Sequence, residues 1–135
     1  MHTLSESPAV QFLSFGYGHG RPPSADLVLD FRSLVDPALD PSLRVLDARD
    51  PRVQHAVLAT PGAGAVITVM TAAALTLRAL HGRPVTVAGG CSGGRHRAPH
   101  LTHHAAERLA ALGLHATTEH RDLDSPLLAP GTGSA

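Results

Sequence analysis

The sequence predicts an α/β fold: one three-layer domain with a small, mostly parallel sheet of about four strands flanked by helices. Short apolar runs alternate along the chain with longer stretches whose apolar residues recur at helical spacing. This alternation favours parallel strands joined by right-handed helical crossovers. Glycines directly follow two of the apolar runs, which is typical of turns where a strand enters a loop. The 135 residues suffice for one domain.

Two strands are predicted in the first part of the chain. Residues 10–15 alternate between apolar and polar side chains and lead into a glycine-rich loop that carries Tyr17 and His19. Residues 26–32 form a second, more continuous apolar run that ends at Arg32. Loops that follow parallel strands share one edge of the sheet, where α/β proteins usually bind ligands.

Helices dominate the middle of the chain. Residues 33–50 contain Asp-Pro pairs and are predicted to form a connecting loop. Asp50 followed by Pro51 predicts a short helix that stops before Thr60. A longer helix then extends as far as Gly82 and carries an apolar stripe, namely Val66, Val69, Met70, Ala73, Leu77 and Leu80.

The last third predicts strand, loop, helix and strand. Residues 85–88 form a buried strand, and a helix with Pro99 in its first turn runs up to Gly113. Residues 115–120 form a polar edge strand. We expect the folded domain to span residues 10–124 and to be flanked by disordered residues 1–9 and 125–135.

Composition bounds the environment of the protein. A single cysteine cannot form an internal disulfide, and the first residues do not resemble a signal peptide, which predicts a cytoplasmic protein. Residues 56–77 lack charge but contain prolines and glycines, so we interpret them as a loop and a buried helix and expect no membrane segment. With 3% aromatic residues the core is thin, which makes a homo-oligomer plausible.

The loop after residues 85–88 predicts an anion pocket. It lies at a helix N-terminus, where unpaired backbone N–H groups and the helix dipole attract a phosphate. Its glycines let the backbone approach an oxyanion, and its side chains supply a thiol, a hydroxyl, an imidazole and a guanidinium: Cys91, Ser92, Gly93, Gly94, His96 and Arg97. The plain alternative is a tight turn with solvated arginines.

Residues after the other strands are expected to join this pocket. His19, Arg32, His120 and Arg121 each follow or end a predicted strand, so the topology would bring them to the same rim. His100 and His104 are four residues apart on the following helix and could hold a metal. Since no third ligand is evident, we interpret them as surface histidines and predict neither a metal nor another cofactor.

The spacing of Cys91 and Arg97 also fits a cysteine-dependent phosphatase, which holds a phosphate between a thiolate and a guanidinium. Asp122 or Asp124 would then be the general acid. Against this function, Gly90 and Ala98 stand where tyrosine phosphatases have a histidine and a hydroxyl. Without lysine, the chain also has no residue for a Walker-type loop or a Schiff base.

Four separate blocks resemble the C-terminal domain of the RapZ family of RNase adapter proteins. The blocks extend over most of residues 10–124 and keep their order: Ser14-Phe15-Gly16 with His19-Gly20, Asp26-Leu27-Val28 with Asp30-Phe31-Arg32, Gly90 to Arg97, and His120-Arg121-Asp122. Family members usually carry an N-terminal P-loop nucleotide-binding domain as well. Neither that domain nor any lysine is present here, so we do not extend nucleotide hydrolysis to this sequence.

The resemblance implies a regulatory domain, not an enzyme, that binds glucosamine 6-phosphate. In some members the domain also binds small RNAs and presents them to a ribonuclease. By motif, Cys91 would structure the loop and the ligand would contact His19, Arg32, Ser92, Gly93, Gly94, His96 and Arg97. The formal net charge of zero favours a small ligand over RNA. Three functions therefore stay open: a phosphosugar sensor or RNA adapter, a phosphatase, and an interaction module with an empty pocket.

Overall fold

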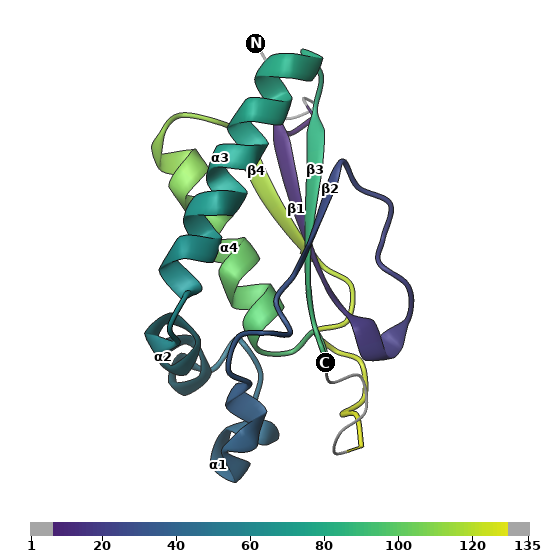
Figure 1. Ribbon diagram of the computed structural model, residues 1–135, viewed down its shortest axis with the longest axis vertical. Helices are drawn as coiled ribbons and strands as arrows, with labels where there is room; N and C mark the ends of the chain where they lie inside the picture. Colours follow the sequence, from purple (N-terminus) through teal and green to yellow (C-terminus); the bar gives the residue numbers. More distant parts are fainter. Residues whose placement is uncertain (1–6, 130–135) are drawn as a thin grey trace.

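A four-stranded parallel sheet forms the centre of the protein. The structure is a computed structural model that describes residues 7–129. The strands lie in the order β2-β3-β1-β4, and every neighbouring pair is parallel. Their bounds are β1 Val10–Gly16, β2 Leu27–Asp30, β3 Val85–Cys91 and β4 Ala116–His120. The prediction of an α/β domain with a parallel sheet flanked by helices is confirmed, and β4 is an edge strand as expected (Figure 1).

The helices begin and end at residues that suit helix ends. Asp50 accepts a hydrogen bond from the backbone N–H of Arg52 and so caps α2, while Gly82 ends α3 with a φ of 63°. The segment predicted as a plain connecting loop contains the short helices η2 and α1. The bounds are η1 Tyr17–His19, η2 Pro37–Leu39, α1 Pro41–Arg44, α2 Pro51–Ala59, α3 Ala63–His81 and α4 Arg97–Ala111.

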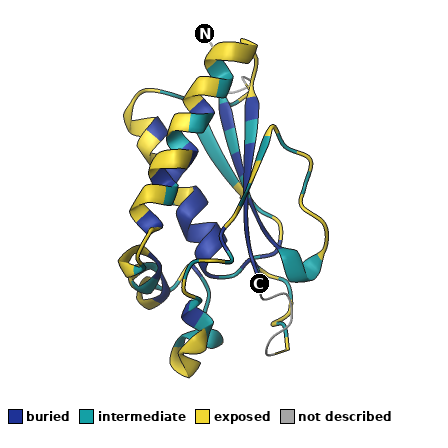
Figure 2. Cartoon of the chain, viewed as in Figure 1, coloured by how far each residue is buried: buried dark blue, intermediate teal, exposed yellow. Residues whose placement is uncertain are grey.

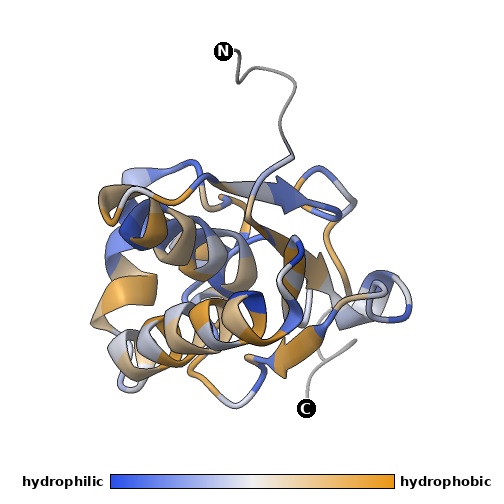
Figure 3. Ribbon diagram, turned by 90° about the horizontal axis from the view of Figure 1, so that it is seen from above, coloured by the Kyte–Doolittle hydropathy of each residue, from blue (hydrophilic) through white to orange (hydrophobic). Residues whose placement is uncertain are grey.

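The strand order determines which side of the sheet each connection covers. The connections from β2 to β3 and from β3 to β4 run in one direction across the sheet, whereas that from β1 to β2 runs the opposite way. Right-handed crossovers therefore put α2, α3 and α4 on one face and residues 17–26 on the other. Figures 1 and 3 show this arrangement. A loop and η1 thus lie on the second face, so among residues 7–129 no α-helices form the third layer that was predicted there.

The core lies between the sheet and the helices. Val10 and Phe12 alternate with less buried residues on β1, as expected for a strand with one face on the core. All three phenylalanines of the chain are buried, and most other core residues are Val, Leu, Ile or Ala. Figure 2 shows buried residues on the strands and on the sheet-facing side of α4. Burial of one Val, Leu, Ile, Met or Phe side chain stabilises the folded state by roughly 1.5–3 kcal/mol.

Helix α3 is long and apolar enough to cross a membrane by length and composition alone. In the fold it lies beside α4 and packs on the core through Ala63, Ile67, Met70 and Ala74. Its outer side exposes Val69 and Leu80, so the prediction that these two residues belong to the stripe packed on the core is wrong. The apolar character of α3 is therefore explained only in part by core packing.

Three predicted boundaries differ from the structure. Cys91 is the last residue of β3 and not part of the loop, because it pairs in register with Gly16 of β1. Arg32 lies beyond β2, which ends at Asp30. Residues 125–129 of the predicted tail are described and lie against the rest of the domain, whereas residues 1–6 and 130–135 lie outside the described part.

Candidate functional site

The site begins where the two central strands end side by side. β1 and β3 are neighbours, with Gly16 in register with Cys91. The connection that follows β1 leaves toward one face of the sheet and the connection that follows β3 toward the other, so the two loops diverge at this point. In open α/β sheets such a divergence creates the crevice in which ligands bind. The topology therefore points to the loop Ser92–His96, which we call the glycine loop.

Backbone-to-backbone contact fixes the glycine loop. Gly94 has a φ of 71°, and a Cβ there would lie 2.8 Å from the backbone nitrogen of Gly16. A Cβ on Gly16 would lie 2.4 Å from the carbonyl carbon of Gly93. Only glycine fits at Gly94 and Gly16 without movement of the main chain. The backbone N–H of Gly18 also donates to the carbonyl oxygen of Ser92 at 2.9 Å, which anchors the loop further.

The glycine loop has free hydrogen-bond donors. Within residues 7–129, no carbonyl or side chain accepts a hydrogen bond from the five backbone N–H groups of Ser92 to His96. The first partner appears at Ala98, whose N–H donates to the Sγ atom of Cys91 at 3.4 Å. Consecutive unpaired N–H groups at the start of a 15-residue helix form a binding site for an anion.

A cavity of about 370 Å³ opens beside the glycine loop. One wall is the loop itself, a second is the segment from Asp36 to Arg44, and a third is formed by residues 127–129. Both polar and apolar groups line it, since Leu39, Leu127 and Leu128 contribute to the lining together with arginines and the loop residues. Its size and mixed lining suit a small organic anion.

Arg97 connects two walls of this cavity. Its side chain is 3% exposed, and Nη1 donates to the carbonyl oxygen of Leu34 at 2.8 Å. Nη2 donates to Oγ of Ser92 at 3.3 Å and lies 3.4 Å from a carboxylate oxygen of Asp36. The guanidinium therefore holds the segment after β2 against the glycine loop, and its Nη2 end remains next to the cavity.

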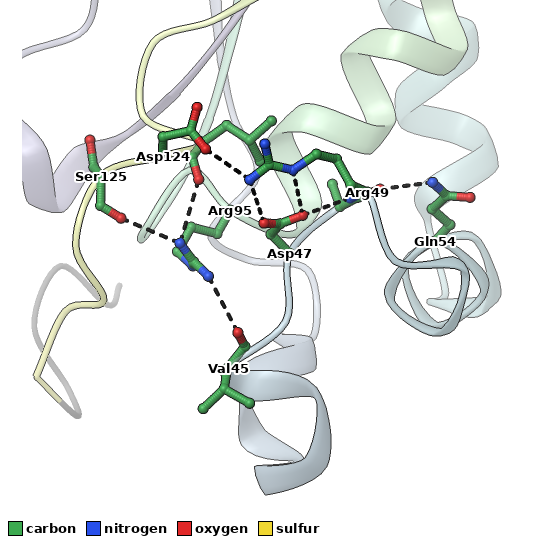
Figure 4. Close-up of polar contacts among 9 residues, drawn as sticks. Val45, Asp47, Arg49, Gln54, Arg95, Asp124 and Ser125 are labelled. Atoms are coloured by element: carbon green, nitrogen blue, oxygen red, sulfur yellow. Dashed lines mark hydrogen bonds and ion pairs between the residues drawn. The ribbon is translucent and has the colours of Figure 1, made fainter.

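Two further arginines line the cavity, and sequence reasoning missed their role. Arg44 donates to the carbonyl oxygen of Leu128 at 2.8 Å. Arg95 donates to three carbonyl oxygens, those of Leu123, Ser125 and Val45, each at 3.4 Å (Figure 4). No carboxylate within the described residues forms an ion pair with either guanidinium. Both positive charges can therefore be offered to an anionic ligand.

His96 and Cys91 contribute structure more than charge. Nε2 of His96 donates to the carbonyl oxygen of Leu43 at 3.1 Å. Burial lowers the pKa of this imidazole, although that hydrogen bond acts in the opposite direction. The ring is therefore neutral at pH 7. Cys91 is 2% exposed, and its sulfur accepts the N–H of Ala98.

The side chains of His19 and Arg32 do not line this cavity, although their segments adjoin the site: the N–H of Gly18 donates to Ser92 at 2.9 Å, and the carbonyl oxygen of Arg32 accepts from Arg97 at 3.2 Å. Arg32 lies over the ring of Tyr17, with 3.8 Å between its Cζ and the ring centre, and pairs with Asp30. The Nε2 atom of His19 is buried with no partner in the described part of the chain. His19 belongs to the connection on the other face of the sheet, whereas Arg32 follows β2 and reaches that connection only through its side-chain contact with Tyr17.

His120 and Arg121 also lie outside the cavity. Nδ1 of His120 is 2.6 Å from Oγ of Ser14, and Arg121 donates to the carbonyl oxygen of Gly16 at 3.2 Å. Arg121 further pairs with Asp122 at 2.9 Å. These contacts hold the loop after β1 in place, so the two residues support the site indirectly.

The two candidate acids have structural partners. The carboxylate of Asp122 accepts the N–H of Gly16 at 2.7 Å. Burial would raise the pKa of Asp122, but hydrogen bonds from Arg121 and Gly16 outweigh it and hold the pKa below its usual value. Asp124 pairs with Arg49 at 2.8 Å (Figure 4). Neither acid lines the cavity.

His100 is buried, so its interpretation as a surface histidine is wrong. A second cavity lies beside this residue and the end of β4. His100, His103 and His120 line this space of about 340 Å³ together with Arg49. Among residues 7–129, no three His, Cys, Asp or Glu side chains are arranged to hold a metal ion.

Comparison with known proteins identifies the family. The sequence model of the RapZ C-terminal domain matches residues 8–124. The chain belongs to this family. A nucleotide-binding protein of Sphingopyxis alaskensis is 40% identical over 122 residues, which cover 87% of this chain and 39% of that protein. One of Rubrobacter xylanophilus is 38% identical over 131 residues, 91% of this chain and 43% of that protein. The chain thus spans about two fifths of the length of these relatives.

Membership in the RapZ C-terminal domain family confirms the resemblance drawn from the four sequence blocks. The matched region contains the glycine loop, Arg44 and Arg97, and it ends at Asp124. Leu127 and Leu128, which complete the cavity, lie beyond it. This wall of the RapZ-type domain is therefore not part of the matched family region.

Proposed function

We propose that this domain is a regulatory module that binds a phosphorylated amino sugar, such as glucosamine 6-phosphate, at the glycine loop. The observation that carries the proposal is the row of five unpaired backbone N–H groups from Ser92 to His96, next to a cavity of about 370 Å³. A phosphate dianion placed there would accept several charge-assisted hydrogen bonds. The sugar would occupy the space toward the leucines.

Side chains around the loop would complete the binding of the phosphate. The hydroxyl of Ser92 and Nη2 of Arg97 lie 3.3 Å apart, so both can reach the same oxyanion. Arg44 and Arg95 donate only to carbonyl oxygens among the described residues, and a phosphate is a stronger acceptor than a carbonyl. Binding would therefore draw these two guanidinium groups from the chain to the ligand.

An RNA-adapter role rests on the family alone. The curated relatives carry the name nucleotide-binding protein and are more than twice as long as the region they share with this chain. A nucleotide or an RNA end would offer the same loop a phosphate. A formal net charge of zero supplies no general attraction for RNA, which favours the small phosphosugar as the first ligand to test.

Phosphate hydrolysis by Cys91 is the alternative, and the geometry favours it less. A nucleophilic thiolate must reach the phosphorus, but Cys91, which contributes to the cavity lining, is 2% exposed and its sulfur accepts the N–H of Ala98. A general acid must carry a proton, but the low pKa of Asp122 keeps it ionised at neutral pH. Asp122 also faces Gly16 and not the cavity. Binding without turnover therefore fits the site better.

Calorimetric titration with glucosamine 6-phosphate tests the proposal. Gly93→Glu should abolish binding without unfolding the loop, because among the described residues a Cβ at Gly93 would meet only Leu128, at 3.9 Å, and the new side chain would bring a carboxylate to the cavity. Gly64→Glu is the matched control, since nothing lies within 4 Å of a Cβ at that position on α3. Equal affinities of the two variants would refute the site.

An assay of aryl phosphate hydrolysis distinguishes the sensor from the cysteine phosphatase. The sensor proposal predicts no turnover by the wild-type protein. Steady hydrolysis that disappears in Cys91→Ser would instead establish the phosphatase.

A further inference from the structure

Among residues 7–129, one acidic side chain lines the cavity beside the glycine loop, together with three arginines. Asp36 is the only carboxylate in its lining within the described residues, where it stands with Arg44, Arg95 and Arg97. Its side chain is 27% exposed, so water and ligands can reach it. A site built only to hold a phosphate gains nothing from a negative charge, because the two anions repel each other. The presence of Asp36 therefore needs an explanation.

One explanation is that Asp36 only orients Arg97. The distance of 3.4 Å from its Oδ2 atom to Nη2 of Arg97 is long for a charge-assisted hydrogen bond. Arg97 is already held by the carbonyl oxygens of Leu34 and Arg32, at 2.8 Å and 3.2 Å. The other carboxylate oxygen, Oδ1, accepts the backbone N–H of Ala38 at 2.9 Å. Within residues 7–129, Oδ2 thus has only this long contact and remains available for a cationic group.

We propose that Asp36 gives the site its specificity by binding a protonated amine of the ligand whose phosphate lies on the glycine loop. This inference rests on the proposed function. Nη2 of Arg97 lies 3.4 Å from Asp36 and 3.3 Å from Oγ of Ser92, so the carboxylate and the Ser92 hydroxyl flank the same nitrogen atom. One sugar ring with its exocyclic carbon is long enough to join the two groups. The site therefore selects phosphates that also carry an ammonium group.

The test compares the dissociation constants of glucosamine 6-phosphate, glucose 6-phosphate and inorganic phosphate by calorimetry at pH 7. The wild-type protein should prefer the amino sugar over glucose 6-phosphate. Asp36→Asn retains an oxygen for the N–H of Ala38 but removes the charge. It should reduce this preference by about tenfold, the usual effect of losing one charge-assisted hydrogen bond, and leave inorganic phosphate at least as tightly bound.

Asp40→Asn is the matched control. Asp40 is four residues away and caps α1 through the N–H of Ser42 at 2.9 Å, as Asp36 caps η2, but it does not line the cavity. This variant should keep the wild-type preference. If Asp36→Asn weakens all three phosphates equally, Asp36 merely positions Arg97 and the inference is wrong, although the proposed function stands. If the wild-type protein binds none of the three, both are wrong.

Discussion

The backbone contact between the glycine loop and β1 predicts opposite effects for two adjacent substitutions. In Gly94→Ala the residue keeps a φ of 71°, which costs an alanine roughly 1–2 kcal/mol. Its Cβ would also lie 2.8 Å from the nitrogen of Gly16 and 2.9 Å from Cβ of Asp122, and such overpacking costs about 1–3 kcal/mol more. The expected loss in the free energy of unfolding is therefore about 2–5 kcal/mol.

Gly93→Ala is the comparison. Gly93 does not have a positive φ, and a Cβ there makes one ordinary contact at 3.9 Å. Because alanine restricts the unfolded chain more than glycine does, the variant should be as stable as wild type or more stable by about 0.4–1 kcal/mol. Urea unfolding followed by circular dichroism measures both variants. Equal midpoints for the two would refute the close contact of the loop with β1.

Three other substitutions test the supports of the site. Arg97→Gln should lower the free energy of unfolding by about 2–4 kcal/mol, since the carbonyl groups of Arg32 and Leu34 lose their donor. A loss below about 0.5 kcal/mol would contradict these contacts. Asp122→Asn should lower the free energy of unfolding by about 1–3 kcal/mol, because its hydrogen bond from the N–H of Gly16 is weakened. Urea unfolding measures this change as well. Stability should also fall as the pH drops below about 6.5, because burial lowers the pKa of His96, His100 and His120 and the unfolded chain then binds more protons. His100→Gln should flatten this part of the pH profile, and an unchanged slope would contradict its burial.

Local patterns in the sequence were sufficient for the fold and for the glycine loop. The caps at Asp50 and Gly82 and the apolar stripes depend on neighbouring residues, so α2 and α3 could be predicted from them. The strand, loop and helix around Ser92 to His96 follow from the same local signals. Only the end of β3 was misplaced, because the pairing of Cys91 with Gly16 is a long-range contact.

The rest of the site depends on contacts that no local pattern contains. The expectation for His19 and Arg32 assumed that all loops at one edge of the sheet converge. The strand order sends the connection after β1, which carries His19, to the opposite face, and the side chain of Arg32 packs on Tyr17 and pairs with Asp30 instead. Arg44 and Leu128 are 84 residues apart and meet only through tertiary packing. No motif marks either residue.

The central claim is that the N–H groups of the glycine loop bind a phosphate. Its most direct test is the titration of the ¹⁵N-labelled protein with glucosamine 6-phosphate, followed through the amide chemical shifts of Ser92 to His96. If the loop binds the phosphate, the shifts should saturate and be largest in these five residues. Shifts centred on another part of the chain, or none at millimolar ligand, would contradict it.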